Sequence, residues 1–307
     1  MANYICIDGG TTNTRLSLAS DGRVVDIVKY SVGAGSSIEN KDILKNTVKN
    51  GINELLCRNS LKAVDIKRIL ASGMITSEFG LLELPHTTTP VGLEELNTCK
   101  CETVLSDISE IPFVFMRGVK TACDVLENAD IMRGEETEVF GILNGDGIYV
   151  LPGSHSKVIT IENGKITDFC TLFTGEMVAA LSGHTILKSS VELKDSEICK
   201  DFLLKGYGYC SEHGLNEALF KTRVLKNTFK KNRSEVYSFF LGVVLCGEVG
   251  YILKKNPQKV TVAGNKALKE PTALLLSELC EAEIVTVPED EVATSTALGM
   301  IRIFEYK

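Results

Sequence analysis

Two short segments of the chain place glycine and hydroxyl side chains directly after an apolar run. The first is residues 8–13, which read DGGTTN and follow the apolar residues 4–7. Glycines let a turn approach a ligand closely, and consecutive backbone N–H groups with two hydroxyls can bind a phosphate. The candidate donors are Gly10, Thr11, Thr12 and Asn13. Asp8 could hold Mg²⁺ through water, since Mg²⁺ keeps several waters in proteins. The same residues also suit an ordinary hairpin turn, so both interpretations stay open here.

The second segment, residues 152–157, reads PGSHSK and also follows an apolar run. Its candidate phosphate donors are Gly153, Ser154, His155 and Lys157. A lone histidine is more often a packed or hydrogen-bonded side chain than an acid or base, and that alternative applies to His155. A third turn, at Gly264, ends another apolar run, and the base or ribose of a nucleotide could lie against its backbone.

A cluster of acidic residues lies at residues 133–138, which read RGEETE. Glu135 or Glu136 could accept the proton of a hydroxyl nucleophile or of a water. Acidic residues in a first helical turn also stabilise the helix dipole and cap backbone N–H groups. From the residues alone, a general base and a simple helix start are equally good interpretations.

The spacing of apolar residues predicts the strands and helices that must position these segments. Residues 4–30 read as three strands, and a second unit of strand, glycine-hydroxyl turn, strand, tight turn and strand begins near residue 147. This weak internal similarity suggests two related halves. Helical spacing is found over residues 39–58, 175–187, 195–204, 212–226, 235–254, 268–280 and 291–304. The helix over 235–254 is apolar nearly all round, which is typical of a buried helix.

Length and composition limit the function classes. A chain of 307 residues favours two domains, and its 44% hydrophobic share excludes a disordered or fibrous protein. The net charge of −7 argues against nucleic acid as a partner, although local donors could still bind a small anion. The ten cysteines lack zinc-type spacing and read as free thiols in a reducing cytoplasm. No leader and no run of about 18 apolar residues is found, so we expect a soluble cytoplasmic protein with no membrane partner.

The three turns, in this order, resemble those of the actin-like/sugar-kinase ATPase superfamily. More specifically, the chain is similar to the 2-dehydro-3-deoxygalactonokinase family. The resemblance lies in residues 7–13, 71–77, 131–138, 151–157, 173–177 and 181–184. The strings MRGEET and PGSHSK are typical of that family, whereas the DGGTT type of turn is found across the superfamily. The chain departs from the family where Gly9 stands, since members usually carry tryptophan there, and Trp is absent from the whole chain.

The resemblance implies an α/β, two-lobed actin-like fold of duplicated mixed β-sheets flanked by helices, with ATP in a cleft between the lobes. The lobes would be residues 1–130 with the terminal helix 291–307, and residues 131–290. The implied reaction moves the γ-phosphoryl group of ATP to the 6-hydroxyl of 2-dehydro-3-deoxy-D-galactonate. Asp8 would orient Mg²⁺, the two turns would hold the phosphates, and Glu135 would be the base, with Glu136 as the alternative.

An anionic sugar acid needs local donors, and we expect them mainly in the loop-rich segment around residues 73–92. The candidate substrate residues are Gly73, Ser77, Thr87, Thr88 and Arg133. Three rivals remain: a kinase of the same fold for another sugar or sugar acid, an exopolyphosphatase-like phosphohydrolase, and a non-catalytic nucleotide sensor. Retention of Asp8, Glu135 and both turns argues against the sensor. The sequence does not give the oligomeric state.

Overall fold

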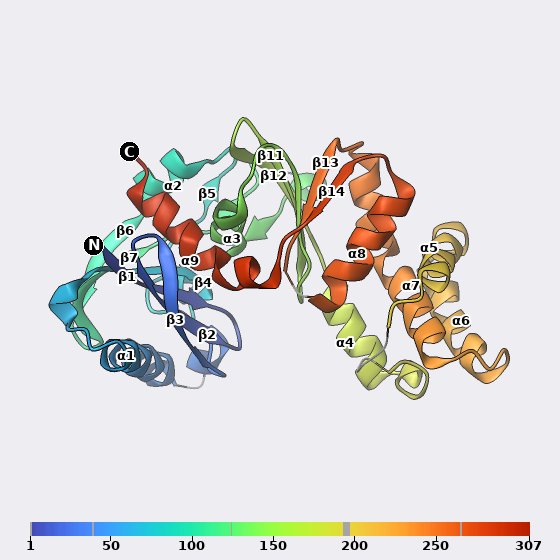
Figure 1. Cartoon of the computed structure of the whole chain (residues 1–307), viewed down its shortest axis with the longest axis horizontal. Coiled ribbons are helices and arrows are strands. Elements are labelled where there is room, and N and C mark those ends of the chain that lie inside the picture. Colours follow the sequence, from blue (N-terminus) through green and yellow to red (C-terminus); the bar gives the residue numbers. More distant parts are fainter. Residues whose placement is uncertain (1, 39, 124, 193–196, 265) are drawn as a thin grey trace. The chain divides into compact units, whose positions relative to one another are not determined.

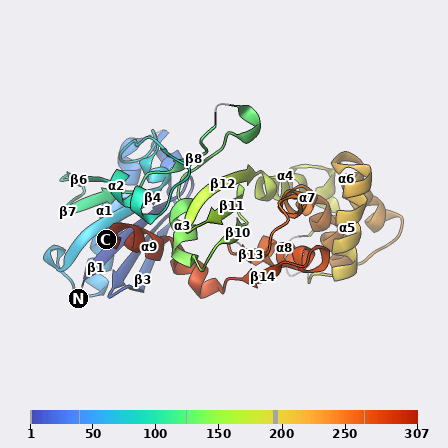
Figure 2. The same cartoon turned by 90° about the horizontal axis from the view of Figure 1, so that it is seen from above.

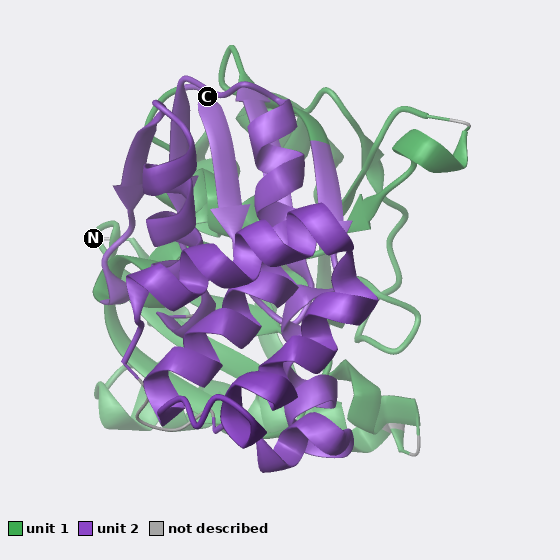
Figure 3. Ribbon diagram, turned by 90° about the vertical axis from the view of Figure 1, so that its right-hand side faces the viewer, with its two compact units in different colours: residues 1–145, 162–168, 290–307 green, residues 146–161, 169–289 purple. Residues whose placement is uncertain are grey.

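The computed structural model describes residues 2–38, 40–123, 125–192, 197–264 and 266–307. They form two compact units, each of which is described here by itself (Figure 3). Unit 1 comprises residues 1–145, 162–168 and 290–307, and unit 2 comprises residues 146–161 and 169–289.

Unit 1 is built on a six-stranded mixed sheet (Figure 1). Its strands, in spatial order, are β3 (Arg23–Tyr30), β2 (Thr14–Ser20), β1 (Asn3–Gly9), β4 (Ile66–Gly73), β7 (Ser109–Phe115) and β6 (Cys101–Leu105). β1 pairs antiparallel with β2 and parallel with β4. A small sheet of β5 (Thr87–Thr88), β8 (Val119–Lys120) and β9 (Ile131–Met132) accompanies it. The three predicted strands over residues 4–30 are therefore confirmed.

The alternation of side chains along β1 gives the main sheet of unit 1 two buried faces. Ile5 and Ile7 join the apolar cluster that includes Leu44 and Val48 of α1 (Lys41–Arg58). On the other face, the Cys6 thiol donates to the carbonyl oxygen of Ala297 in α9 (Glu289–Glu305). Helices therefore cover both sides of the strand that carries Asp8 near its carboxyl end. The remaining helices of unit 1 are α2 (Leu93–Cys99) and α3 (Glu135–Ile142).

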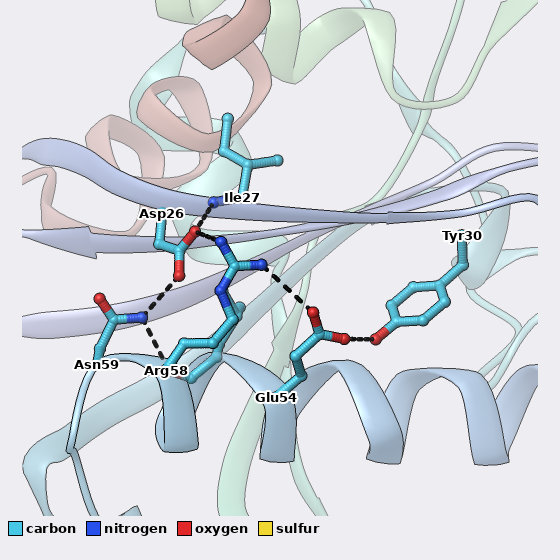
Figure 4. Close-up of polar contacts among 7 residues, drawn as sticks. Asp26, Ile27, Tyr30, Glu54, Arg58 and Asn59 are labelled. Carbon is cyan, nitrogen blue, oxygen red and sulfur yellow. Dashed lines mark hydrogen bonds and ion pairs between the residues drawn. The ribbon is translucent and has the colours of Figure 1, made fainter.

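Polar contacts fasten β3 to the end of α1 (Figure 4). The Asp26 carboxylate accepts from the guanidinium of Arg58 at 2.8 Å and from the side-chain amide of Asn59 at 2.8 Å. The Tyr30 hydroxyl donates to Glu54 at 2.6 Å. Partly exposed contacts of this kind contribute little energy each, so their main effect is to fix the position of the helix on the sheet.

Unit 2 contains a five-stranded sheet and most of the helices (Figure 2). The strand order is β12 (Lys165–Leu172), β11 (Ser156–Glu162), β10 (Gly147–Leu151), β13 (Lys259–Val262) and β14 (Glu283–Thr286). The helices are α4 (Thr174–His184), α5 (Lys200–His213), α6 (Leu215–Asn227), α7 (Arg233–Lys254) and α8 (Lys266–Leu279). β10 pairs antiparallel with β11 and parallel with β13, the same pattern that β1 makes in unit 1. The duplication expected from the sequence is thus present in the strand pairing.

The boundary of unit 1 differs from the expected lobe boundary at residue 130. β9 pairs with β8, and Gly141 of α3 packs against the backbone of Ser295 in α9, so residues 131–145 belong to unit 1. The turn between β11 and β12 also belongs to unit 1, where Val91 bridges Ile166. The acidic cluster around Glu135 is therefore part of the first unit and not of the second.

Among the described helices, α7 is long and apolar enough to cross a membrane. Of its 18-residue apolar window, 72% is buried inside the structure. Such burial is what a core helix has, and it explains why the helix is apolar all round. The sequence prediction of a buried helix over residues 235–254 is confirmed. All ten cysteines are free thiols.

Candidate functional site

The turn after β1 is held by the backbone that follows β3. The Gly10 carbonyl accepts from the N–H of Ala34 at 3.0 Å, and the Thr11 carbonyl accepts from Gly35 at 2.8 Å. A Cβ on Gly33 would lie 2.5 Å from the same turn, so only glycine allows this approach. Thr11, Thr12 and Asn13 are all exposed. The N–H of Gly10 donates to the Asn13 carbonyl at 2.8 Å, so of the predicted donors of this turn only Thr11, Thr12 and Asn13 are open to a ligand.

A hollow of about 450 Å³ lies beside this turn within unit 1. Its lining residues are Asp8, Gly10, Asn13, Thr14, Arg15, Lys29, Tyr30 and Ser31. Arg15 and Lys29 are cross-strand partners on β2 and β3, and they place two cations beside the turn. Sequence reasoning missed both residues, although Arg15 follows the motif by two positions. The positive charge makes this hollow suitable for an anion.

Asp8 lies at the carboxyl end of β1 among charged neighbours. Burial raises the pKa of Asp8, the carboxylate of Glu135 raises it further, and Arg15 opposes the rise. Burial of Glu138 itself, together with the nearby carboxyl groups of Asp8 and Glu135, raises the pKa of Glu138 to about 8. Mg²⁺ in phosphate sites is bound by one or two carboxylates together with phosphate oxygens and water. The donors around Asp8 fit such an ion, because carboxylate charge lies beside a turn suited to phosphate.

The two glutamates at the start of α3 have different surroundings. Glu136 is fully buried, and its carboxylate accepts from the N–H of Gly134 at 2.7 Å and from the Ser72 hydroxyl at 3.3 Å. Burial and the neighbouring Glu135 raise the pKa of Glu136 to about 8. Glu135 is only partly buried, and its carboxylate accepts from the N–H of Arg133 at 3.0 Å. Of the two, only Glu135 has an exposed part that a substrate hydroxyl could reach.

Glycines bring the start of α3 against the end of β4. Gly134 has a φ of +118°, and a Cβ on it would lie 3.2 Å from the Cα of Gly73. Gly73 has a φ of +87°, and a Cβ on it would lie 2.5 Å from the carbonyl oxygen of Gly9. Gly9 itself has no room for a side chain, because a Cβ there would lie 2.7 Å from Ile75. Three predicted parts of the site, the Asp8 turn, Gly73 and the Glu135 helix start, are thus in contact.

The other candidate substrate residues are less available than expected. The guanidinium of Arg133 donates to the Thr76 carbonyl at 2.8 Å and to the Leu84 carbonyl at 3.0 Å, and it lies 3.2 Å from the His86 ring. The Ser77 hydroxyl donates to the Met74 carbonyl at 2.7 Å.

The hydroxyl of Thr87 lies 3.0 Å from the Cys99 thiol, whereas Thr88 is exposed. Arg133 therefore orders the loop after β4, and His86, which the sequence reasoning did not single out, lies beside it.

The second predicted turn lies in unit 2 between β10 and β11. The Ser154 carbonyl accepts from the N–H of Glu176 at 3.0 Å, and a Cβ on Gly264 would lie 2.5 Å from the Pro152 carbonyl. Ser154 and His155 are exposed, and the His155 ring lies 5.3 Å from that of Phe173.

Lys157 is only 4% exposed. The structure brings Gly153, Ser154, His155 and Gly264 together, but it buries the side chain of Lys157.

Comparison with known proteins gives one consistent family. The sequence model of a family described as 2-keto-3-deoxy-galactonokinase matches residues 8–301. A 2-dehydro-3-deoxygalactonokinase from Escherichia coli (strain K12) is 26% identical over 255 residues, which are 81% of this chain and 80% of the relative.

The solved structures agree on the fold. The crystal structure of a proposed 2-dehydro-3-deoxygalactonokinase from Sinorhizobium meliloti has a TM-score of 0.78 at 20% identity, with 98% of this chain and 97% of that chain covered. An activator of 2-hydroxyisocaproyl-CoA dehydratase from Clostridium difficile, solved with bound ADPNP, has a TM-score of 0.54 at 11% identity over 99% of this chain and 95% of its own. This chain therefore shares its α/β fold with both structures, as expected from the sequence.

Proposed function

This chain belongs to the 2-keto-3-deoxy-galactonokinase family, and we propose that it transfers the γ-phosphoryl group of ATP to the 6-hydroxyl of 2-dehydro-3-deoxy-D-galactonate. Its family makes it a phosphotransferase with an alcohol group as acceptor, and ATP use follows from the kinase fold. The observation that carries the finer proposal is the contact between the Asp8 turn, Gly73 and the start of α3. It brings the turn suited to phosphate close to the partly exposed carboxylate of Glu135.

Different residues of unit 1 have different roles in the proposed reaction. Asp8 would hold Mg²⁺, and this ion would neutralise phosphate charge. The N–H groups of residues 11–13 and the hydroxyls of Thr11 and Thr12 bind phosphate oxygens, and Arg15 adds positive charge beside them. Because the transition state for phosphoryl transfer is loose, fixed position and charge matter more than strong deprotonation.

Glu135 accepts the proton of the attacking hydroxyl in this proposal. Its partial exposure and its effect on the pKa of Asp8 support this role. Glu136 instead holds the backbone of Gly134 from a buried position. The loop of residues 73–92 binds the sugar acid, and Arg133 supports that loop by donating to the backbone carbonyls of Thr76 and Leu84.

The residues Gly153, Ser154 and His155 bind further phosphate oxygens of ATP, and Gly264 lies against the nucleoside. The family resemblance and the exposure of Ser154 and His155 support this part of the proposal. We also propose that the protein works in the cytoplasm on small molecules, without nucleic acid or a membrane as partner.

The test is an ADP-release assay with ATP, Mg²⁺ and a panel of six-carbon keto-deoxy sugar acids. We expect rapid ADP release only with 2-dehydro-3-deoxy-D-galactonate, and ³¹P NMR should place the phosphate on its 6-hydroxyl. If another sugar acid is preferred, that compound is the substrate, and the assignment as a sugar-acid kinase stands. Phosphate release without any sugar acid would instead favour a phosphohydrolase.

A further inference from the structure

A buried carboxyl group in unit 2 has no part in the mechanism above. Glu248 belongs to α7 and is 1% exposed. Its neighbours on the helix, such as Leu245, Val249 and Ile252, are buried and apolar. A carboxyl group in such a core is costly unless hydrogen bonds compensate for the lost water. A leucine would be cheaper at this position, so the carboxyl group needs a separate explanation.

The hydrogen bond of Glu248 leads to the start of α4, the helix that is fastened to the 152–157 turn. The hydroxyl of Thr174, the first residue of α4, donates to Oε2 of Glu248 at 2.5 Å. The second oxygen, Oε1, and the buried hydroxyl of Ser156 have no hydrogen-bond partner among the described residues. Ser156 is the first residue of β11. Burial raises the pKa of Glu248, and the hydroxyls of Thr174 and Ser156 oppose that rise.

The first turn of α4 is itself fastened to the 152–157 turn. The N–H of Glu176 donates to the carbonyl of Ser154 at 3.0 Å. A Cβ on Gly175 would lie 2.2 Å from the carbonyl oxygen of Gly153, so the two backbones are in direct contact. A chain of contacts therefore runs from Glu248 through Thr174 and α4 to the backbone of Gly153 and Ser154.

We propose that Glu248 is a positioning residue for the nucleotide phosphates, and that its carboxyl group holds the start of α4 so that the 153–155 backbone keeps its binding conformation. Glu248 acts through Thr174 and does not touch the ligand. The inference rests on the proposed function, in which this turn binds phosphate oxygens of ATP.

The test compares Glu248→Gln with Glu248→Leu by titration calorimetry with ATP and Mg²⁺. Glutamine keeps an oxygen that accepts from Thr174, so we expect ATP affinity within about threefold of the wild type. Leucine removes the acceptor at similar volume, and we expect ATP affinity to fall by roughly 10-fold or more. The KM for ATP should rise in parallel, whereas the KM for the sugar acid should not change.

Two further variants make the result specific. Glu235→Gln lies at the start of the same helix, far along it from residue 248, and should bind ATP as the wild type does. Thr174→Val removes the hydroxyl donor and leaves a side chain of similar size. It replaces Glu248→Leu in the test if Glu248→Leu does not fold. We expect weaker ATP binding in Thr174→Val as well.

Wild-type ATP affinity in folded Glu248→Leu or in Thr174→Val would overturn the inference. So would a lower melting temperature without any change in ATP affinity, because that is the result of a purely structural role. A wild-type protein that fails to bind ATP would overturn the proposed function itself, and that failure is visible before any variant is measured.

Discussion

Asp8 is a partly buried carboxyl group beside a turn suited to phosphate. We predict that Asp8→Asn lowers kcat by about 10²–10³, the range for loss of a preorganised electrostatic group. ATP affinity should change little, because the turn donors are held by backbone contacts to Ala34 and Gly35. Steady-state kinetics and ATP titration of the variant check both parts. Near-normal turnover at saturating Mg²⁺ would remove Asp8 from the mechanism.

Glu135 and Glu136 are neighbours in sequence but differ in exposure. We predict that Glu135→Gln lowers kcat by about 10²–10⁴ with an unchanged melting temperature, as expected for loss of a general base. Glu136→Gln should keep most of the turnover, because a glutamine oxygen can still accept from Gly134. Measuring kcat and melting temperature for both variants decides the assignment. Unchanged kcat in both would make the pair simple helix-start residues.

The raised pKa of Glu136 predicts a specific dependence of stability on pH. The pKa is about 8 in the folded protein against an ordinary 4.5, so folding takes up a proton between these values. The stabilisation is full below about pH 4.5 and is lost as the pH rises through about 8. Glu136→Gln cannot titrate at this position. As the pH rises from 5 to 8.5, we therefore expect the melting temperature of Glu136→Gln to rise relative to that of the wild type. A difference that is constant over this range would contradict the shift.

Residue types showed which chemistry was available, but not which side chains were free to perform it. The acidic cluster and both turns were readable from the sequence, since glycine, hydroxyl and carboxyl groups follow apolar strands. The burial of Glu136 was not readable, because it depends on Ser72, a residue of a distant strand. For the same reason the sequence did not show that Arg133 donates to the carbonyls of Thr76 and Leu84.

At the scale of elements, glycines allow α3 and α9 to cross at very short distance. A Cβ on Gly299 would lie 1.7 Å from the carbonyl oxygen of Thr137. We predict that Gly299→Ala destabilises the protein by about 1–3 kcal/mol, the usual cost of overpacking, and lowers kcat because α3 carries Glu135. The matched control is Gly250→Ala, since nothing lies within 4 Å of its Cβ position in α7. That variant should be as stable as the wild type or more so. Urea unfolding of both variants checks the prediction, and equal stabilities would contradict it.

Element types with strong periodicity were predictable, and short or non-local elements were not. The predicted helix over residues 235–254 matches α7 closely, because its apolar pattern extends over many turns. The predicted helix over residues 195–204 begins later, at Lys200, and its first two positions lie outside the described residues. The two-residue strand β9 left no periodic signal, and its pairing with β8 carries residues 131–145 into unit 1.

At the scale of the whole molecule, the sequence showed two related halves because each begins with a strand, a glycine-hydroxyl turn and a returning strand. The pairing pattern of β1 and of β10 confirms this repeat. The precise division of the chain was beyond sequence reasoning, because contacts between distant segments decide it. The bridge from Val91 to Ile166 is one such contact.

The family and the two turns predict that nucleotide binding stabilises the folded chain. A ligand that binds only the folded state adds about 2.7 kcal/mol of stability at 100 times its dissociation constant. We therefore expect ATP with Mg²⁺ to raise the melting temperature by several degrees, and excess EDTA to reduce this gain, because the cation that would neutralise phosphate charge beside Asp8 is then removed. Asp8→Asn should keep a large part of the gain while kcat falls, since the turn donors remain. Differential scanning fluorimetry of the wild type and of Asp8→Asn measures both effects, with GDP–Mg²⁺ as a control for nucleotide specificity. A wild-type melting temperature that does not respond to ATP, with or without Mg²⁺, would mean that these turns do not bind nucleotide phosphates.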